Sequence, residues 1–295
     1  MKRAVLLYNA KAGKGKIEKN IDHIVDIFRE AGFDMQPLPI RFGANPFDWC
    51  GAVDLAVVAG GDGTVNYVVN AMMNKQLAIN LGIIPAGTAN DFAGALGMSN
   101  NILKAARQIA QGDVELIDCG KVEQMESGEN KVIYFVNIFS FGIFTTTSQR
   151  TPEQLKHRIG KMAYLVAAFK ELRNIHGIPL TITSDSGAFY YPTLMGLVFN
   201  GETAGRVPIA RKSSLRDGVF DCIFLRKRTP FVSAMDMLLY MVGIKTSAVK
   251  YLRTSQLVLV TPMNEDTDVD GQSGGRFPMK VNCLHGALRI VCPKS

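Results

Sequence analysis

The first part of the chain alternates short apolar runs with amphipathic stretches. A parallel sheet covered by helices on both faces produces this pattern, because its strands are buried on both sides and consist of apolar residues. The pattern predicts strands over residues 4–8, 54–59 and 81–84, and helices over residues 17–31, 65–73 and 102–111. We therefore expect a doubly wound α/β domain over residues 1–120.

Beyond residue 120 the apolar runs become strand-like and are separated by polar turns, as in an antiparallel β domain. Strands are expected over residues 132–136, 180–183, 194–199, 219–225, 257–260 and 288–291, with helical segments at 152–173 and 230–252. The expected fold class is an N-terminal α/β domain followed by an antiparallel β-rich domain, a β-sandwich, over residues 121–295. Whether the last residues of the chain return to the first domain is left open.

Composition narrows the class of protein. The 295 residues are 47% hydrophobic and 20% charged, as in globular proteins. No apolar run reaches the roughly 18 residues that span a bilayer. The opening Met1-Lys2-Arg3 leads into a strand-like run rather than a signal peptide, so we expect a cytoplasmic protein. The net charge of +7 favours an anionic partner but cannot choose among nucleic acid, a phosphorylated substrate and an acidic membrane.

Several chemistries lack their sequence signals. The five cysteines include no pair at CxxC or metal-ligand spacing, so buried thiols are expected rather than disulfides. The four histidines have no HExxH spacing, which disfavours a zinc site. No serine lies in a GxSxG elbow, and no RNP-like or helix-turn-helix signal occurs. Hydrolases and nucleic-acid binders are therefore disfavoured.

A glycine-rich turn, Gly60 to Thr64, joins the predicted strand 54–59 to the next helix. Backbone without Cβ atoms can approach phosphate oxygens closely, and a helix N-terminus favours negative charge. The turn matches neither GxxxxGK[ST] nor GxGxxG. Asp62 within it would repel phosphate unless a divalent cation or a proton transfer involves it. The alternative is an ordinary Asp-Gly turn.

A second polar loop, Gly87 to Asp91, follows the predicted strand 81–84. Both loops leave carboxyl ends of parallel strands, so we expect them at one edge of the sheet, where doubly wound folds bind ligands. Together with the opening Asn9 to Gly13, they resemble the catalytic-domain family of soluble diacylglycerol and sphingosine kinases, in the NAD kinase-like superfamily. Further matching positions are Asn137, Ser140, Gly142, 161–165, Asn200-Gly201, Pro208, Ala210, Asp217-Gly218 and Asp270-Gly271.

The resemblance implies an ATP site, a Mg²⁺ site and a catalytic base. The ATP site would consist of Asn9, Gly60, Gly61, Asp62, Gly63, Thr64, Asn66, Gly87 and Thr88. A structural Mg²⁺ would be held by Asp217 together with the main-chain carbonyls of Ser214 and Val219. The base of bacterial members lies in an Asp-Gly-Glu motif, which corresponds to Asp270, Gly271 and Gln272.

Gln272 departs from the family pattern, because an amide cannot accept a proton at neutral pH. The base is therefore expected to be Asp270, with Asp62 as the alternative; otherwise the activity is reduced. Tyr67 stands where the family usually has Glu, which removes a charge near the cleft. Ala10 replaces the usual Pro, which costs only turn rigidity.

A kinase that acts on a membrane lipid needs an apolar wall and a basic rim. The segment from Phe231 to Val242 supplies apolar side chains. Cations lie at Lys156, Arg158, Lys161, Lys170, Arg173, Arg211, Lys212, Arg216, Arg226, Lys227 and Arg228. The expected partners are a lipid alcohol substrate and an anionic membrane surface bound peripherally, with no nucleic acid and with a homodimer left open. The alternative is a core helix with solvated basic faces.

The resemblance therefore implies an ATP-dependent lipid kinase that transfers the γ-phosphoryl group to a lipid hydroxyl, with Mg²⁺ as counter-charge. Diacylglycerol is the leading acceptor, and its product is phosphatidic acid. Two alternatives are an NAD kinase-like enzyme and a catalytically weak lipid-binding or regulatory protein. Gln272 motivates the second of these.

Overall fold

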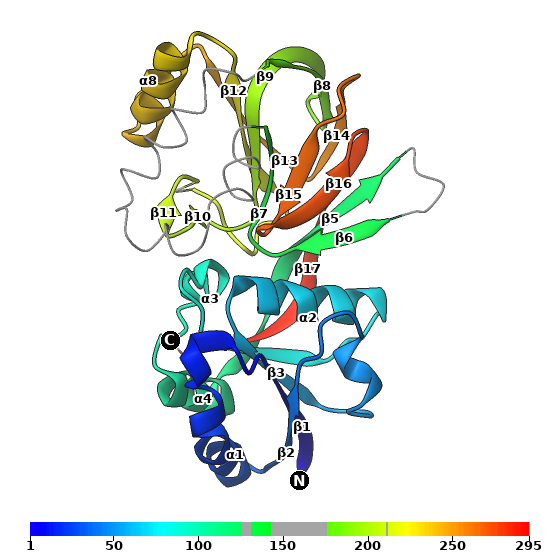
Figure 1. Cartoon of the computed structure of the whole chain (residues 1–295), viewed down its shortest axis with the longest axis vertical. Coiled ribbons are helices and arrows are strands. Elements are labelled where there is room, and N and C mark those ends of the chain that lie inside the picture. Colours follow the sequence, from blue (N-terminus) through cyan, green and yellow to red (C-terminus); the bar gives the residue numbers. More distant parts are fainter. Residues whose placement is uncertain (126–130, 143–175, 211, 295) are drawn as a thin grey trace.

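The computed structural model describes residues 1–125, 131–142, 176–210 and 212–294. Two domains follow one another along the long axis of the molecule, with helices concentrated in the N-terminal domain and strands in the C-terminal one (Figure 1). The N-terminal domain is a parallel α/β unit and the C-terminal domain is β-sandwich-like, which confirms the expected fold class.

The first domain is built on parallel strands in the order β4-β3-β1-β2. They are β1 (Lys2–Tyr8), β2 (Phe33–Pro39), β3 (Leu55–Gly60) and β4 (Asn80–Pro85). The apolar pattern does not predict β2, because Pro37 and Pro39 interrupt it. Both prolines are tolerated since β2 is an edge strand, where a missing backbone N–H breaks no inner ladder.

Helices α1 (Ile21–Glu30), α2 (Asp62–Asn74), α3 (Asp91–Ala95) and α4 (Ile102–Gln111) complete this domain. Short 3-10 turns cover Ala12–Gly15, Glu18–Asn20 and Pro46–Asp48. The helix predicted from residue 17 begins at Ile21, because residues before it form 3-10 turns. The α1 helix buries Ile24 and Phe28 and packs beside α4.

The second domain pairs its strands antiparallel. They are β5 (Asp113–Gln124), β6 (Val132–Phe135), β7 (Ile138–Gly142), β8 (Ile178–Ser184), β9 (Gly187–Phe199), β10 (Thr203–Ala204), β11 (Val207–Pro208), β12 (Phe220–Arg226), β13 (Val249–Thr254), β14 (Gln256–Val260), β15 (Asp266–Val269), β16 (Gln272–Arg276) and β17 (Met279–Cys292). Its core is rich in phenylalanine, and the rings of Phe135 and Phe220 stack with centroids 5.4 Å apart.

One helix is shorter than expected. The Met- and Leu-rich pattern predicts a helix over 230–252, but α8 (Pro230–Met241) ends before Gly243. Gly243 has a φ of +86°, a left-handed conformation that ends an α-helix. Val249–Thr254 instead forms β13, which pairs with β12. The other predicted helix, 152–173, lies outside the described residues.

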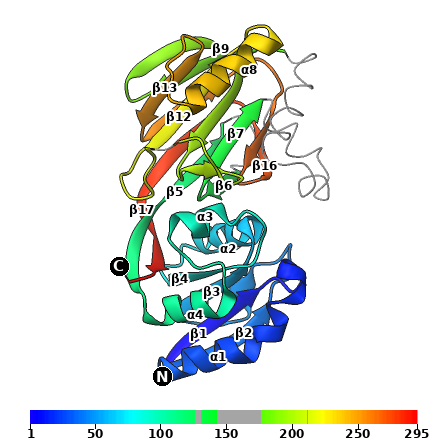
Figure 2. The same cartoon turned by 90° about the vertical axis from the view of Figure 1, so that its left-hand side faces the viewer.

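Two strands join the domains. The β17 strand pairs antiparallel with β5, and its end also pairs parallel to β4, where Arg289 lies opposite Asn80 (Figure 2). The expected boundary at residue 120 falls inside β5. The α2 helix contacts β3 of the first domain and β6 of the second. Residues at the amino end of α2 are therefore held by both domains.

Two further expectations are tested by the fold. All five cysteines are free thiols; four of them are buried, as expected for each, whereas Cys283 is only partly buried. In the described part of the chain, no helix combines the length and the apolar composition needed to cross a bilayer.

Candidate active site

The glycine-rich turn Gly60 to Thr64 and the second polar loop Gly87 to Asp91, called the two glycine loops below, touch each other through their backbones. They follow the adjacent strands β3 and β4, whose last residues, Gly60 and Pro85, lie opposite each other in the sheet. A Cβ placed on Gly87 would lie 2.5 Å from the Cα of Gly61. A Cβ on Gly60 would lie 2.5 Å from the Thr64 side chain. A side chain at Gly60 or Gly87 would therefore disturb the packing of the loops. This requirement is separate from the close approach of the loop backbone to phosphate oxygens.

The nine predicted ATP ligands lie on these loops and beside them. The Asn9 Nδ2 donates a hydrogen bond to the Thr64 Oγ1 over 3.2 Å, which joins the end of β1 to the start of α2. Gly63 and Thr88 are exposed, whereas Thr64 and Asn66 are buried. The structure therefore brings the predicted residues to one edge of the sheet, around the N-terminus of α2.

Asp62 is the first residue of α2 and faces the second loop. Its carboxylate accepts hydrogen bonds from the backbone N–H of Asn90, at 2.7 Å, and of Phe92, at 3.4 Å. Burial raises the pKa of Asp62 and the nearby Asp91 carboxylate raises it further, against the opposing effect of these hydrogen bonds. Asp62 is therefore a more basic carboxylate than an ordinary surface aspartate.

Asp91, which sequence analysis did not single out as a site residue, fastens the second loop to the other domain. Its carboxylate accepts hydrogen bonds from Thr203 Oγ1, at 2.8 Å, and from the backbone N–H groups of Gly205 and Arg206, each at 2.7 Å. The Arg206 guanidinium returns a bond to the Ala89 carbonyl over 2.9 Å. The position of Asp91 in the second loop was visible in the sequence, but its partners 112 to 115 residues away were not.

Asp270 is half-buried, and both oxygens of its carboxylate accept hydrogen bonds. Its Oδ2 accepts from Asn66 Nδ2 and from the Val136 N–H, and its Oδ1 accepts from the N–H groups of Asn137 and Ile138, over 2.8 to 3.1 Å. An ionised carboxylate has about four acceptor positions. These four bonds engage both oxygens with Asn66 and with backbone N–H groups.

Burial nevertheless dominates the titration of Asp270. It raises the pKa to about 6, although the four hydrogen bonds act to lower it. The backbone of Asp270 adopts a φ of +49°, which turns the side chain back against the segment between β6 and β7. Asp270 as the base stays a prediction, and in this structure its carboxylate also joins α2 of the first domain to the second domain.

Gln272, two residues further along, does reach the first loop. Its Nε2 donates to the Gly63 carbonyl over 3.3 Å, and its side chain is exposed. Position 272 is therefore the one on β16 that faces the glycine loop, and this chain carries an uncharged donor there.

Tyr67, which stands where the family usually has Glu, contacts the loop of residues 41–44. Its hydroxyl lies within hydrogen-bond distance of the carbonyls of Arg41, at 3.3 Å, and Ala44. The Phe42 ring packs edge-on against Tyr67 with centroids 5.0 Å apart. The tyrosine thus fixes the 41–44 loop against the first turns of α2.

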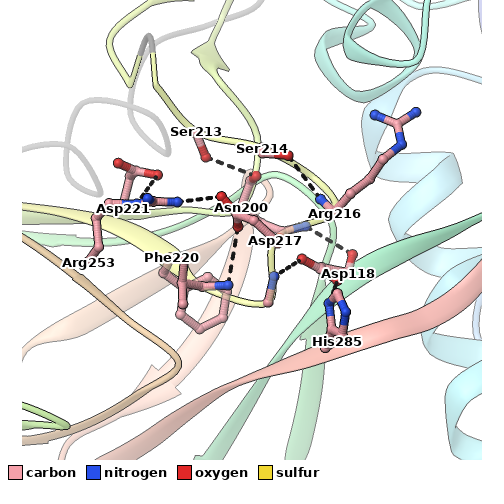
Figure 3. A network of polar contacts seen from close by, with 12 residues as sticks. Asp118, Asn200, Ser213, Ser214, Arg216, Asp217, Phe220, Asp221, Arg253 and His285 are labelled. Atoms are coloured by element: carbon pink, nitrogen blue, oxygen red, sulfur yellow. Dashed lines mark hydrogen bonds and ion pairs between the residues drawn. The ribbon is translucent and has the colours of Figure 1, made fainter.

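The predicted Mg²⁺ residues lie in a turn beside the domain junction (Figure 3). The Asp217 Oδ1 accepts from the Val219 N–H over 3.3 Å, and its Oδ2 pairs with the Arg253 guanidinium. In the described residues, no group of three His, Cys, Asp or Glu side chains could hold a metal ion. That search does not cover main-chain carbonyls such as those of Ser214 and Val219, so the Mg²⁺ site stays a prediction, with Asp217 paired to Arg253 in this structure.

Asp118 organises the same junction. Its buried carboxylate accepts from the backbone N–H groups of Gly218, at 2.7 Å, and Gly286, at 2.8 Å, and lies 2.8 Å from the His285 Nδ1 (Figure 3). The 217–218 turn and β17 are both fastened to β5 in this way. Asp118 was not predicted from the sequence, although a charged residue between the apolar Ile117 and Cys119 could have indicated a buried structural carboxylate.

Known families match both domains. The family profile described as diacylglycerol kinase catalytic domain covers residues 3–122. The profile described as YegS C-terminal NAD kinase beta sandwich-like domain covers residues 137–292. The two profiles together include both glycine loops, the Asp217 turn and Asp270.

Relatives match over the full length. The diacylglycerol kinase of Bacillus subtilis (strain 168) is 30% identical over 303 residues, which is 100% of this chain and 97% of the relative. The diacylglycerol kinase of Staphylococcus epidermidis (strain ATCC 12228 / FDA PCI 1200) is 29% identical over 301 residues, which is 99% of this chain and 93% of the relative.

Solved structures share the fold. A diacylglycerol kinase from Bacillus anthracis str. Sterne superposes with a TM-score of 0.74 at 24% identity, covering 99% of this chain and 97% of the other. The yeast NADH kinase complexed with NADH superposes with a TM-score of 0.56 at 13% identity, covering 100% and 84%. At these identities the two structures establish the fold alone.

Proposed function

The chain belongs to the diacylglycerol kinase catalytic-domain family, and we propose that the lipid it phosphorylates is diacylglycerol, giving phosphatidic acid. As a member of an ATP-using kinase family, it is a diacylglycerol kinase-like phosphotransferase. The observation that carries the proposal is the contact of the two glycine loops at the N-terminus of α2, in a chain whose full-length relatives are named diacylglycerol kinases.

The N-terminus of α2 supports binding of the ATP phosphates. A helix N-terminus presents backbone N–H groups and a partial positive charge to an anion. Gly61 and Gly63 keep the approach free of side chains, and the helix behind them is 13 residues long. The ATP enters with Mg²⁺ as part of the substrate, and that ion supplies counter-charge to the phosphates.

We assign proton transfer to Asp62 and positioning to Asp270. Asp62 lies on the glycine loop and accepts backbone hydrogen bonds from Asn90 and Phe92, whereas both oxygens of Asp270 are engaged with Asn66 and with backbone N–H groups. The raised pKa of Asp62 favours this role, because a base works best when its pKa approaches the working pH. Gln272 offers its amide to the loop and takes no proton.

The proposed step transfers one phosphoryl group. The oxygen of the lipid hydroxyl forms a bond to the γ-phosphorus while the bond from that phosphorus to the bridging oxygen of ADP breaks. The hydroxyl proton passes to the Asp62 carboxylate, and ADP leaves. Because such a transition state is loose, positioning and charge neutralisation contribute more than the base does. Replacement of a family Glu by Gln272 is therefore compatible with an active enzyme.

A total lipid extract offers the first test. The chain is incubated with γ-labelled ATP and Mg²⁺ in the presence of mixed micelles of that extract, and the chloroform-soluble products are separated. We expect the label in phosphatidic acid. Label in another phospholipid would change the acceptor, and absence of any labelled lipid would favour the regulatory alternative. Parallel incubation with NAD tests the remaining rival, which the 13% identity to yeast NADH kinase supports only at the level of fold.

A further inference from the structure

The α8 helix carries apolar side chains on two opposite faces. Its inner face packs on the second domain, where Met237 is 4% exposed and lies in a cluster with Ile223 and Leu225. Its outer face is open to solvent, with Phe231 76% exposed and Val242 62% exposed. The outer set consists of Phe231, Val232, Met235, Leu238, Val242 and Ile244, and we name it the α8 apolar face.

The described part of the fold does not explain why these apolar side chains are exposed to solvent. A helix on the surface of a globular protein normally turns polar residues to water and apolar ones to the core. Phe231, Met235 and Leu238 follow one another at intervals of four and three residues and form one stripe along the helix, which Val242 continues at the C-cap. Six of the fifteen exposed large apolar side chains in the described part of the chain lie in this short segment. Apolar exposure concentrated in this way marks an interaction surface.

The charges around the α8 apolar face are positive. Between residues 226 and 250 the chain has cations at Arg226, Lys227, Arg228, Lys245 and Lys250, and one acid, Asp236. Asp236 is 7% exposed and pairs with Arg228 over 3.7 Å, so it faces inward. Lys227 precedes the helix and Lys245 follows it, and both are exposed. No carboxylate in this segment opposes an anionic partner.

We propose that the α8 apolar face docks on an anionic lipid bilayer, with the helix lying in the plane of the interface. Such a helix inserts its apolar stripe at the boundary between head groups and acyl chains, while flanking lysines reach the lipid phosphates. The inference deepens the proposed function and rests on it, because a kinase for a membrane lipid needs a surface that holds it at the bilayer.

The position of α8 agrees with this docking. It lies at the end of the second domain that points away from the first domain (Figure 1). At 12 residues, it offers a contact about 18 Å long at the usual rise of an α-helix. The first domain, with the glycine loops, then remains on the water side, where ATP is available.

Sedimentation with sucrose-loaded vesicles tests the proposal. The vesicles contain phosphatidylcholine with phosphatidylglycerol and no diacylglycerol, so binding is measured independently of the substrate. We expect the full chain to bind, and the triple variant Phe231→Ser/Leu238→Ser/Val242→Ser to lose at least tenfold in partition coefficient. The matched control Val114→Ser/Leu116→Ser removes exposed apolar side chains from β5 and should bind as the unmodified chain does. Circular dichroism checks that each variant is folded.

The single tryptophan allows a second, local readout. Trp49 lies in the first domain and is 51% exposed. In the variant Trp49→Phe/Phe231→Trp the only tryptophan is on α8, and its emission should shift to the blue when anionic vesicles are added. The emission of Trp49 in the unmodified chain should not shift.

Three results would overturn the proposal. The first is equal vesicle binding by the triple variant and its control. The second is vesicle binding by Trp49→Phe/Phe231→Trp without a blue shift of its tryptophan emission. The third is a lower sedimentation coefficient of the triple variant, which would show that the substitutions disrupt a homodimer. A separate measurement, which does not depend on vesicle binding, tests the proposed function. Phosphorylation of a water-soluble short-chain diacylglycerol should persist in the triple variant, and its absence in the unmodified chain would contradict the kinase assignment while leaving docking intact.

Discussion

The Nδ2 of Asn66 lies 2.9 Å from the Oδ2 of Asp270, which joins the first turns of α2 to the turn before β16 across 204 residues of sequence. The same carboxylate accepts from three consecutive backbone N–H groups, those of Val136, Asn137 and Ile138, where β7 begins. Asp270 thereby holds the helix that carries the glycine loop against the second domain. The loop and the position of Gln272 are set relative to each other by this contact.

Asp270→Asn should destabilise the folded chain. An asparagine turns one acceptor oxygen into a donor that faces backbone donors, and buried hydrogen bonds to a charged group contribute about 1.5 to 3 kcal/mol each. We expect a loss of about 3 kcal/mol in the free energy of unfolding, measured by urea denaturation. An Asp270→Asn variant with unchanged stability and no activity would instead support Asp270 as the base.

The stability difference between the unmodified chain and Asp270→Asn should depend on pH. The pKa of Asp270 is about 6 in the folded chain, above its ordinary value of 3.8, so the folded state holds this proton more tightly than the unfolded state. The proton-linked part of the contribution of Asp270 to stability is therefore greatest below pH 3.8 and is lost as the pH rises through about 6. The part that comes from its hydrogen bonds to Asn66 and the backbone remains at neutral pH. The unmodified chain should exceed the variant by more at pH 5 than at pH 7. A larger excess at pH 7 would show that the folded-state pKa is not raised.

Gly87→Ala should impair both folding and activity. The new Cβ would lie 2.5 Å from the Gly61 Cα and 2.8 Å from the Asn90 Oδ1, so the two loops must separate. Overpacking of this kind costs about 1 to 3 kcal/mol. Gly94→Ala is the control, because nothing lies within 4 Å of its Cβ and it belongs to a helix. Equal effects of the two substitutions on the melting temperature and on KM for ATP would contradict the contact between the loops.

The unmodified chain should show no Mg²⁺-dependent gain in melting temperature in the absence of nucleotide. Asp217 is already paired with Arg253, so a cation gains little by binding there. In Arg253→Ala the carboxylate is released, and a gain with Mg²⁺ over EDTA should appear. A clear gain in the unmodified chain would restore the predicted Mg²⁺ site at Ser214, Asp217 and Val219.

The parallel α/β domain could be predicted because its strands and loops are local patterns. The apolar run before Gly60, and the glycines themselves, marked the loop and its position at the end of a strand. The β2 strand escaped prediction because Pro37 and Pro39 break the apolar pattern and are tolerated only at an edge. The end of α8 was placed too late because apolar residues recur beyond it as far as Leu252, whereas Gly243 ends the helix and Val249–Thr254 forms β13.

The roles of the site residues could be predicted only in part from the sequence. Asp62 could be singled out because a carboxylate within a glycine loop is unusual. The contacts of Asp270 could not be predicted, because its four donors lie 132 to 204 residues away in the sequence. For the same reason a sequence motif alone favoured Asp270 as the base, and it could not reveal that Arg253 pairs with Asp217.

The most direct measurement is the initial rate of phosphatidic acid formation from dioctanoylglycerol and ATP, for the unmodified chain and for Asp62→Asn. The account predicts turnover by the unmodified chain and a loss of 10²- to 10⁴-fold, the usual range for removal of a general base, in a variant that remains folded. Turnover by Asp62→Asn equal to that of the unmodified chain, or label transferred to NAD and not to dioctanoylglycerol, would contradict it.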